Sequence, residues 1–217
     1  MSFQPYDWNV VVVGHWNRAI LTPAGIGKRL FALPEGTPVS VELPIDGISP
    51  CRVRHGGLTV VAADDRILIG MDDLGYEHLR AAMGLGVAAL EGLPETPVSA
   101  AGFNIRFKDP DPSPEFSTRM ACDIDDRISD QGLPISARGL SRSLVWNGGF
   151  INLQITLDEQ EGGHAIFNFH RASHNAEDLT AWLRVDLAEV RTTTEALLTE
   201  VLGIETREAG NECADRQ

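Results

Sequence analysis

The sequence predicts an α+β protein in which helices cover one face of a curved antiparallel sheet. Short runs of β-branched residues are separated by Gly or Asp turns, which is typical of antiparallel hairpins. The segment 74–90 has the apolar periodicity of a helix that packs on a sheet, and a second long helix is expected over 176–202 from its start and stop residues. The order strand, helix, several strands, long helix occurs twice. We therefore expect two halves, 1–97 and 98–204, that share one sheet, followed by a disordered tail at 205–217.

The first half begins with a predicted strand over 9–16, where four consecutive valines suit a buried position. Thr22 and Pro23 then favour the start of a short helix that ends near Phe31, because Thr is a good N-cap and Pro is tolerated in the first turn. Alternating or β-rich runs predict further strands at 38–43, 52–55, 58–62 and 66–71. Asp73 is a suitable N-cap for the helix over 74–90.

The second half repeats this order with different residues. Four strands are predicted at 98–107, 141–146, 150–157 and 164–171. A proline-rich connector over 109–114 and a short helix within 117–130 separate the first two of these strands. Asn175 is a suitable N-cap for the long helix over 176–202, and Gly203 favours its end.

This element order resembles the duplicated fold of the TATA-box-binding protein, a curved antiparallel sheet with helices on its convex face. The resemblance covers roughly residues 9–203 and concerns topology alone, since no sequence motif of that family occurs. The stretch Gly102-Phe-Asn-Ile-Arg-Phe is also similar to strands in uncharacterised bacterial families.

The composition limits the classes of partner. The formal net charge is −13, whereas a general nucleic-acid binder or a polybasic membrane-surface protein needs a cationic footprint. The three cysteines are widely spaced and form no Cys-x-x-Cys pair, which favours a reducing compartment. Without a signal-like N-terminus or a long apolar run, we expect a cytoplasmic protein that does not enter a membrane.

Motif searches give no catalytic or cofactor site. The sequence contains no Gly-x-Ser-x-Gly elbow and no complete phosphate loop. Gly84 and Gly86 fit a loose dinucleotide pattern, but they lie inside a predicted helix, so helix–sheet packing explains them better. The acidic run 123–126 is expected to be a solvated helix face. His164 and His170 are too far apart along one strand to share a metal. His170 and His174 could approach each other across the strand end, but the spacing fixes no carboxylate near them. We therefore predict no cofactor and no metal.

The alternation of successive side chains between the two faces of a sheet, which we call strand parity, gives the most useful functional signal. If alternate apolar residues of each strand pack against the helices, the residues between them face away. We call the face of the sheet that points away from the helices the open face. On this rule it carries Glu42 as its acidic member together with Arg52, Arg54, Asn104, Arg106, Asn152, Gln154, His164, Asn168 and His170. Such a face would be locally positive on an acidic protein. An exposed sheet face must be polar in any case, so simple solvation also accounts for these residues.

These observations predict a non-catalytic protein-interaction module, such as an adaptor, inhibitor or antitoxin-like protein, that uses the polar sheet face. We expect its partner to be another protein, and a homodimer is an alternative that the sequence does not decide. The alternative is a small-ligand or anion binder, or an enzyme, with an Arg and His site on the same face. Single-stranded nucleic acid would need stacking aromatic residues, of which this face clearly offers only Phe150.

Overall fold

The computed structural model describes residues 3–46 and 49–204. In chain order, the first elements are β1 (Gln4–Pro5), β2 (Asn9–Gly14), α1 (Pro23–Arg29), β3 (Ser40–Glu42), β4 (Arg52–His55), β5 (Leu58–Ala62), β6 (Arg66–Met71) and α2 (Tyr76–Gly92). They are followed by β7 (Val98–Asp109), α3 (Pro114–Met120), α4 (Asp123–Ser129), β8 (Ala137–Trp146), β9 (Gly149–Asp158), β10 (Gly162–Ala172), α5 (Ala176–Leu183) and α6 (Leu187–Ala196). A π-helical turn, Leu197–Val201, ends the described secondary structure. The predicted tail at 205–217 lies outside the described residues.

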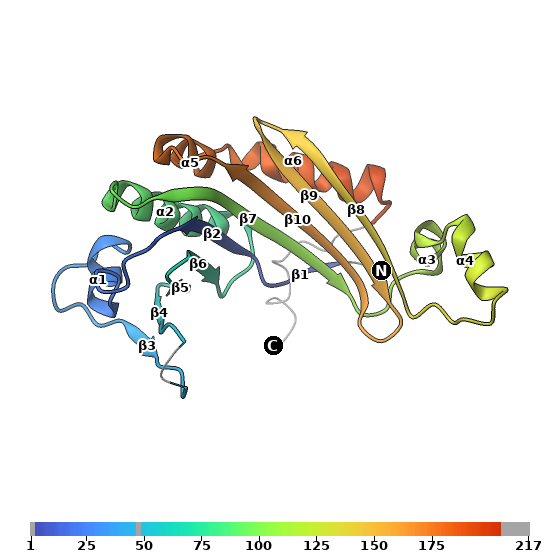
Figure 1. Cartoon of the computed structure of the whole chain (residues 1–217), viewed down its shortest axis with the longest axis horizontal. Helices are drawn as coiled ribbons and strands as arrows, with labels where there is room; N and C mark the ends of the chain where they lie inside the picture. The colour runs from blue at the N-terminus through green and yellow to red at the C-terminus, as the bar shows by residue number, and fades with distance from the viewer. Residues whose placement is uncertain (1–2, 47–48, 205–217) are drawn as a thin grey trace, which may run out of the picture.

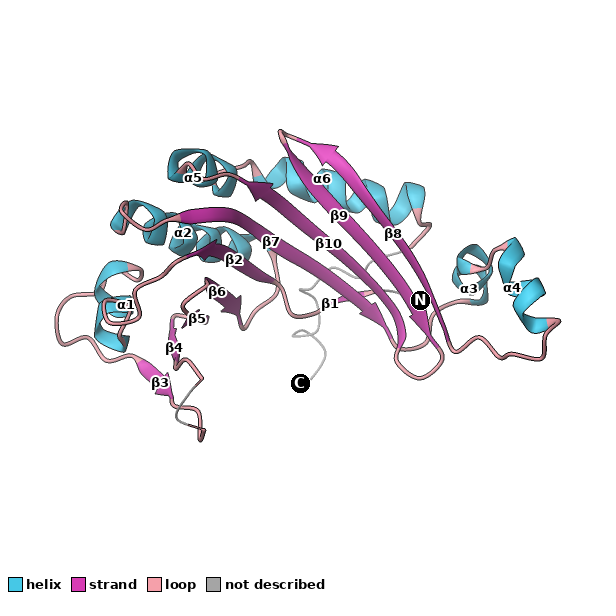
Figure 2. Cartoon of the chain, in the orientation of Figure 1, coloured by secondary structure: helices cyan, strands magenta, loops and turns pink. Residues whose placement is uncertain are grey.

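The strands form one ten-stranded sheet, and the predicted α+β class is confirmed. Nine strands follow the order β3-β4-β5-β6-β2-β7-β10-β9-β8, while β1 pairs with β7. Every pairing is antiparallel. The strand order therefore brings β2 and β7, far apart in the chain, side by side in the middle of the sheet (Figure 2).

The principal helices cover one face of this sheet. α2 packs on β2 and β6, whereas α5 packs on β7 and β10, and the two helices also contact each other. In Figure 1 α2, α5 and α6 lie behind the strands, so the opposite face of the sheet is turned toward the viewer. α1 lies near the β3 end, and α3 and α4 lie beyond the start of β8.

Aromatic side chains fill the space between the sheet and α5. Phe103 of β7 lies opposite Phe169 of β10, and their rings stack with centroids 4.7 Å apart. Trp182 of α5 and Trp146 of β8 close the cluster, with centroids 5.6 Å apart. Because burial of a large apolar side chain contributes roughly 1.5–3 kcal/mol, this cluster holds α5 firmly on the sheet.

Three predicted helices differ in detail from the observed ones. Asp73 does not cap α2, because the helix begins after Gly75, whose backbone is extended. The long helix predicted over 176–202 is interrupted after α5, since Asp186 accepts a hydrogen bond from the Ala188 amide and thereby starts α6. The short helix within 117–130 is two helices, α3 and α4, and Ser113 caps the first of them.

Candidate functional site

The nine residues predicted for the open face all lie on the side of the sheet opposite the helices. The strand pairings place Asn104, Asn168 and Asn152 directly opposite one another on β7, β10 and β9. Their neighbours along each strand, such as Phe103 and Phe167, are buried on the helix side. Parity therefore gave the correct side for these residues, whereas their role in binding stays a prediction.

The central polar feature of this face is a row of side chains joined by hydrogen bonds, which we call the amide row. Its members are Asn9, Asn104, Asn168, Asn152 and Ser143, one each from β2, β7, β10, β9 and β8. The Ser143 hydroxyl donates to Asn152 Oδ1 at 2.8 Å, and Asn152 Nδ2 donates to Asn168 Oδ1 at 3.0 Å. Asn168 Nδ2 then donates to Asn104 Oδ1 at 2.9 Å, and Asn104 Nδ2 donates to Asn9 Oδ1 at 2.8 Å.

The side chains of the amide row bond to one another and still have donors and acceptors for further hydrogen bonds. Each of the three central amides uses one N–H and one carbonyl lone pair along the row. A side-chain amide has two N–H groups and two lone pairs, so one of each is left for a partner. Asn9 and Ser143 were not predicted as site residues, although Val10 and Leu144 as neighbouring core residues would have placed both on this face.

A second line of side chains runs beside the amide row, and we call it the apolar row. It consists of Val61, Leu68, Val11, Phe150 and Val145, with Gly102 and His170 between Val11 and Phe150. The exposed fractions of Leu68, Phe150 and Val145 are 36%, 44% and 81%. The sequence argument recognised only Phe150 of this row. It expected the run of four valines that includes Val11 to be buried, and it gave no side for Val61, Leu68 or Val145.

The arginines of the open face are less available than the sequence implied. Arg54 pairs with Glu42 at 3.0 Å and with Asp72 at 2.6 Å, and its hydrogen bond with Glu42 is the largest effect that raises its pKa. Arg106 pairs with Asp7. Among the described residues, Arg52 has no such partner. Because Asp7 and Asp72 lie in loops, strand parity could not place them, and the predicted local positive charge is largely neutralised.

The arginines and histidines also do not converge on one site. Arg54 on β4 and Arg106 on β7 are separated by four strand spacings, or about 19 Å. His164 and His170 lie six residues apart along β10. One small molecule could therefore not contact all of these side chains together.

His164 belongs to a separate cluster where β1 joins the sheet. Its Nδ1 lies 3.2 Å from the hydroxyl of Tyr6, while its buried Nε2 has no hydrogen-bond partner among the described residues. Lys108 lies over the Tyr6 ring, 5.6 Å from its centroid. Burial is the largest effect on the pKa of Tyr6 and raises it, so the phenol stays neutral at physiological pH. These contacts fasten the N-terminal segment to the sheet.

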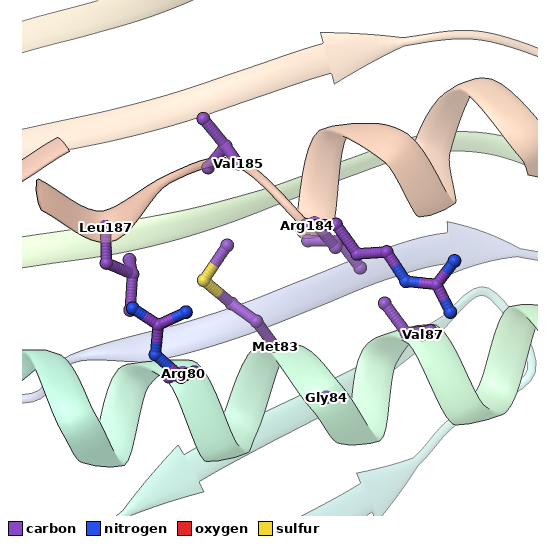
Figure 3. Close-up of a pocket in the computed structure, with 8 residues that line it drawn as sticks. Arg80, Met83, Gly84, Val87, Arg184, Val185 and Leu187 are labelled. Carbon is purple, nitrogen blue, oxygen red and sulfur yellow. The ribbon is translucent and has the colours of Figure 1, made fainter. Parts of the chain in front are cut away.

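Two surface hollows lie away from the open face. One, of about 340 Å³, lies between α2 and the α5–α6 link and is lined by Met83, Val87 and Leu187 among others. Figure 3 shows Arg80 and Arg184 on either side of Met83. The other hollow, of about 380 Å³, lies between α1 and the loop 33–39. Neither contains a residue predicted for the open face.

The remaining candidates can also be placed. Within residues 3–46 and 49–204, no group of three or more His, Cys, Asp or Glu side chains is arranged to hold a metal ion. Asp125 of the acidic run forms an ion pair with Arg138 of β8, and this hydrogen bond is the largest effect that lowers its pKa. None of the helices in the described parts of the chain is long and apolar enough to span a membrane.

Comparisons with models of protein families and with curated proteins give no match. The open face, with its amide row and apolar row, is therefore the candidate site that the chain itself defines.

Proposed function

We propose that the chain is a non-catalytic protein-interaction module that binds another protein on the open face of its sheet. The observation that carries this proposal is the apolar row, which exposes Leu68, Phe150 and Val145 next to a row of amides. Contact of exposed apolar side chains with a partner removes them from water, at roughly 25 cal/mol per Å². The amides beside them supply directional hydrogen bonds to the same partner.

A protein suits this surface better than the other ligand classes. Apolar and amide groups in neighbouring rows match a polypeptide, which carries both apolar side chains and backbone N–H and C=O groups. An anion site or an enzyme built from Arg and His is a weaker proposal, because those side chains are spread over the sheet and two of the arginines are already paired. The net charge of −13 opposes general binding of nucleic acid, despite the topological resemblance to the TATA-box-binding protein.

A paired-variant capture experiment tests the proposal. The protein is immobilised as wild type, as the double variant Leu68→Ser/Phe150→Ser, and as Ile124→Ser, and proteins captured from its native cells are quantified by mass spectrometry. Ile124 serves as the control, because it is also an exposed apolar residue, with an exposed fraction of 61%, but lies on α4 and not on the open face. A partner should be lost by the double variant and retained by Ile124→Ser. If every captured protein binds all three forms equally, the open face is not the binding surface.

A further inference from the structure

β8 is a long strand at the edge of the sheet. All ten of its residues pair with β9, from Ala137 opposite Asp158 to Trp146 opposite Gly149, without a register shift. Within residues 3–46 and 49–204, no other strand pairs with its outer side. The opposite edge of the sheet is β3, which has only three residues. Natural sheets usually shorten, bend or interrupt their edges, and β8 contains neither a proline nor a bulge.

The turn after β8 determines which backbone groups point outward. Asn147 and Gly148 have φ values of 45° and 73°, as in the two-residue type I′ turn, which makes Trp146 and Gly149 a hydrogen-bonded pair. Every second residue of β8 counted back from Trp146 therefore directs its backbone N–H and C=O to β9. The residues between them direct their N–H and C=O to the free edge; these are Ala137, Gly139, Ser141, Ser143 and Val145.

One side-chain contact agrees with this geometry. Arg142 Nη1 donates to the outward carbonyl of Ser141 at 2.8 Å. It is the only hydrogen bond to these outward backbone groups between Gly139 and Val145 among the described residues. The outward groups of Ser143 and Val145 can therefore accept another strand directly.

The edge is also locally basic. β8 contains Arg138 and Arg142 and no carboxylate, in a chain of net charge −13. Arg138 forms an ion pair with Asp125 of α4, whereas the exposed Arg142 donates to the backbone carbonyl of Ser141 and has no ion-pair partner among the described residues. A strand with a carboxylate opposite Arg142 would gain an ion pair as well as the backbone hydrogen bonds.

We propose that β8 accepts an extended acidic segment of a partner protein as an additional antiparallel strand. This deepens the proposed function, because it gives the chemistry of the partner and a second contact beside the open face, which Val145 links to the edge. The segment places a carboxylate opposite Arg142 and apolar side chains opposite Leu140 and Leu144. A second copy of the chain fits less well, since its own β8 would bring the same two arginines to the edge and no carboxylate.

A short capped peptide serves as the probe. Its sequence is Ile-Thr-Val-Thr-Glu-Thr-Val-Thr-Glu, which we call the Glu peptide. A matched Lys peptide has Lys in place of both Glu. Binding is followed by NMR titration of isotope-labelled protein. The Glu peptide should shift amide signals of residues 139–145 and bind at least tenfold more tightly than the Lys peptide.

Three variants test the geometry. Ser143→Pro removes an outward N–H without touching the bonds to β9, so it should weaken the Glu peptide at least tenfold. Ser143→Ala keeps that N–H and should bind within twofold of wild type. Arg142→Glu should reverse the preference between the two peptides, and it keeps the proposal testable should Ser143→Pro fail to fold.

The outcomes separate this proposal from the proposed function. Leu68→Ser/Phe150→Ser should bind the Glu peptide as wild type does, because its changes lie on the open face. Absence of Glu-peptide binding, or equal binding by Ser143→Pro and wild type, would overturn the edge proposal, even if partner capture on the open face succeeds. A dimer of the wild-type chain that Ser143→Pro dissociates would also overturn it, since the edge would then hold a second copy.

Discussion

The side-chain amide of Asn168 donates a 2.9 Å hydrogen bond to the side-chain carbonyl of Asn104, its direct neighbour on the adjacent strand. Asn168 also accepts a hydrogen bond from Asn152, and Asn104 donates one to Asn9. Four hydrogen bonds thus connect five strands across the face of the sheet opposite α2 and α5. The first prediction follows from this connection.

Asn168→Ala should lower the free energy of unfolding by about 1–2 kcal/mol, because it removes two hydrogen bonds and leaves the groups on Asn104 and Asn152 unpaired. A double-mutant cycle with Asn104→Ala should show a coupling of about 0.5–1.5 kcal/mol, measured by urea unfolding. Gln154→Ala is the control, since Gln154 lies on the same face without a hydrogen bond among the described residues. It should change stability by less than about 0.5 kcal/mol. Additive effects of Asn104 and Asn168 would mean that the row is not coupled.

Two glycines of α2 should respond in opposite directions to the same change. A methyl group on Gly84 would meet no atom within 4 Å, so Gly84→Ala should stabilise the protein by about 0.5–1 kcal/mol. A methyl group on Gly86 would lie 2.8 Å from Leu183 Cδ1 and 3.4 Å from Val12 Cγ2, between the helix and the sheet. Gly86→Ala should therefore destabilise by about 1–3 kcal/mol. Thermal unfolding checks the order, and a Gly86→Ala variant as stable as Gly84→Ala would contradict the close packing.

Tyr76 should make stability fall at alkaline pH. Burial raises its pKa to about 12 from an ordinary value of 10. In the unfolded chain the phenol loses its proton near pH 10, while in the folded protein it keeps the proton, so the unfolded state binds fewer protons and stability decreases as pH rises from about 10 to about 12. The loss should approach about 3 kcal/mol. Comparing the pH dependence of urea unfolding in wild type and Tyr76→Phe measures it, and equal slopes would exclude the effect.

The ion pairs of Arg54 give a prediction about salt. Arg54→Ala should lower the midpoint of thermal unfolding, because Glu42 and Asp72 lose their shared cation. Arg52→Ala should leave the midpoint nearly unchanged, since Arg52 has no ion-pair partner among the described residues. The difference between the two variants should shrink as salt concentration rises, because exposed charges are screened. A difference that is independent of salt would point to packing by the Arg54 side chain instead.

Much of the fold followed from the sequence by local rules. Apolar alternation placed the strands within a few residues, and parity put Asn104, Asn152 and Asn168 on the open side, because successive side chains of a strand face opposite ways. Thr22 and Asn175 cap α1 and α5 as predicted, since a cap is made with the residues next to it. The two-residue strand β1 was missed, because its pairing with β7 spans about a hundred residues of chain.

The sequence by itself determined on which side of the sheet the nine predicted polar residues lie, since that depends only on the alternation within each strand. The tertiary structure alone decided which residues become neighbours, because strand order and register are set by long-range packing and not by local pattern. Register joined five separate side chains into the amide row and aligned Leu68 with Phe150 in the apolar row. Loop positions brought Asp7 and Asp72 to the arginines and so removed most of the positive charge that parity had predicted. The order of strands also left β8 at the edge, with half of its backbone hydrogen-bonding groups directed outward.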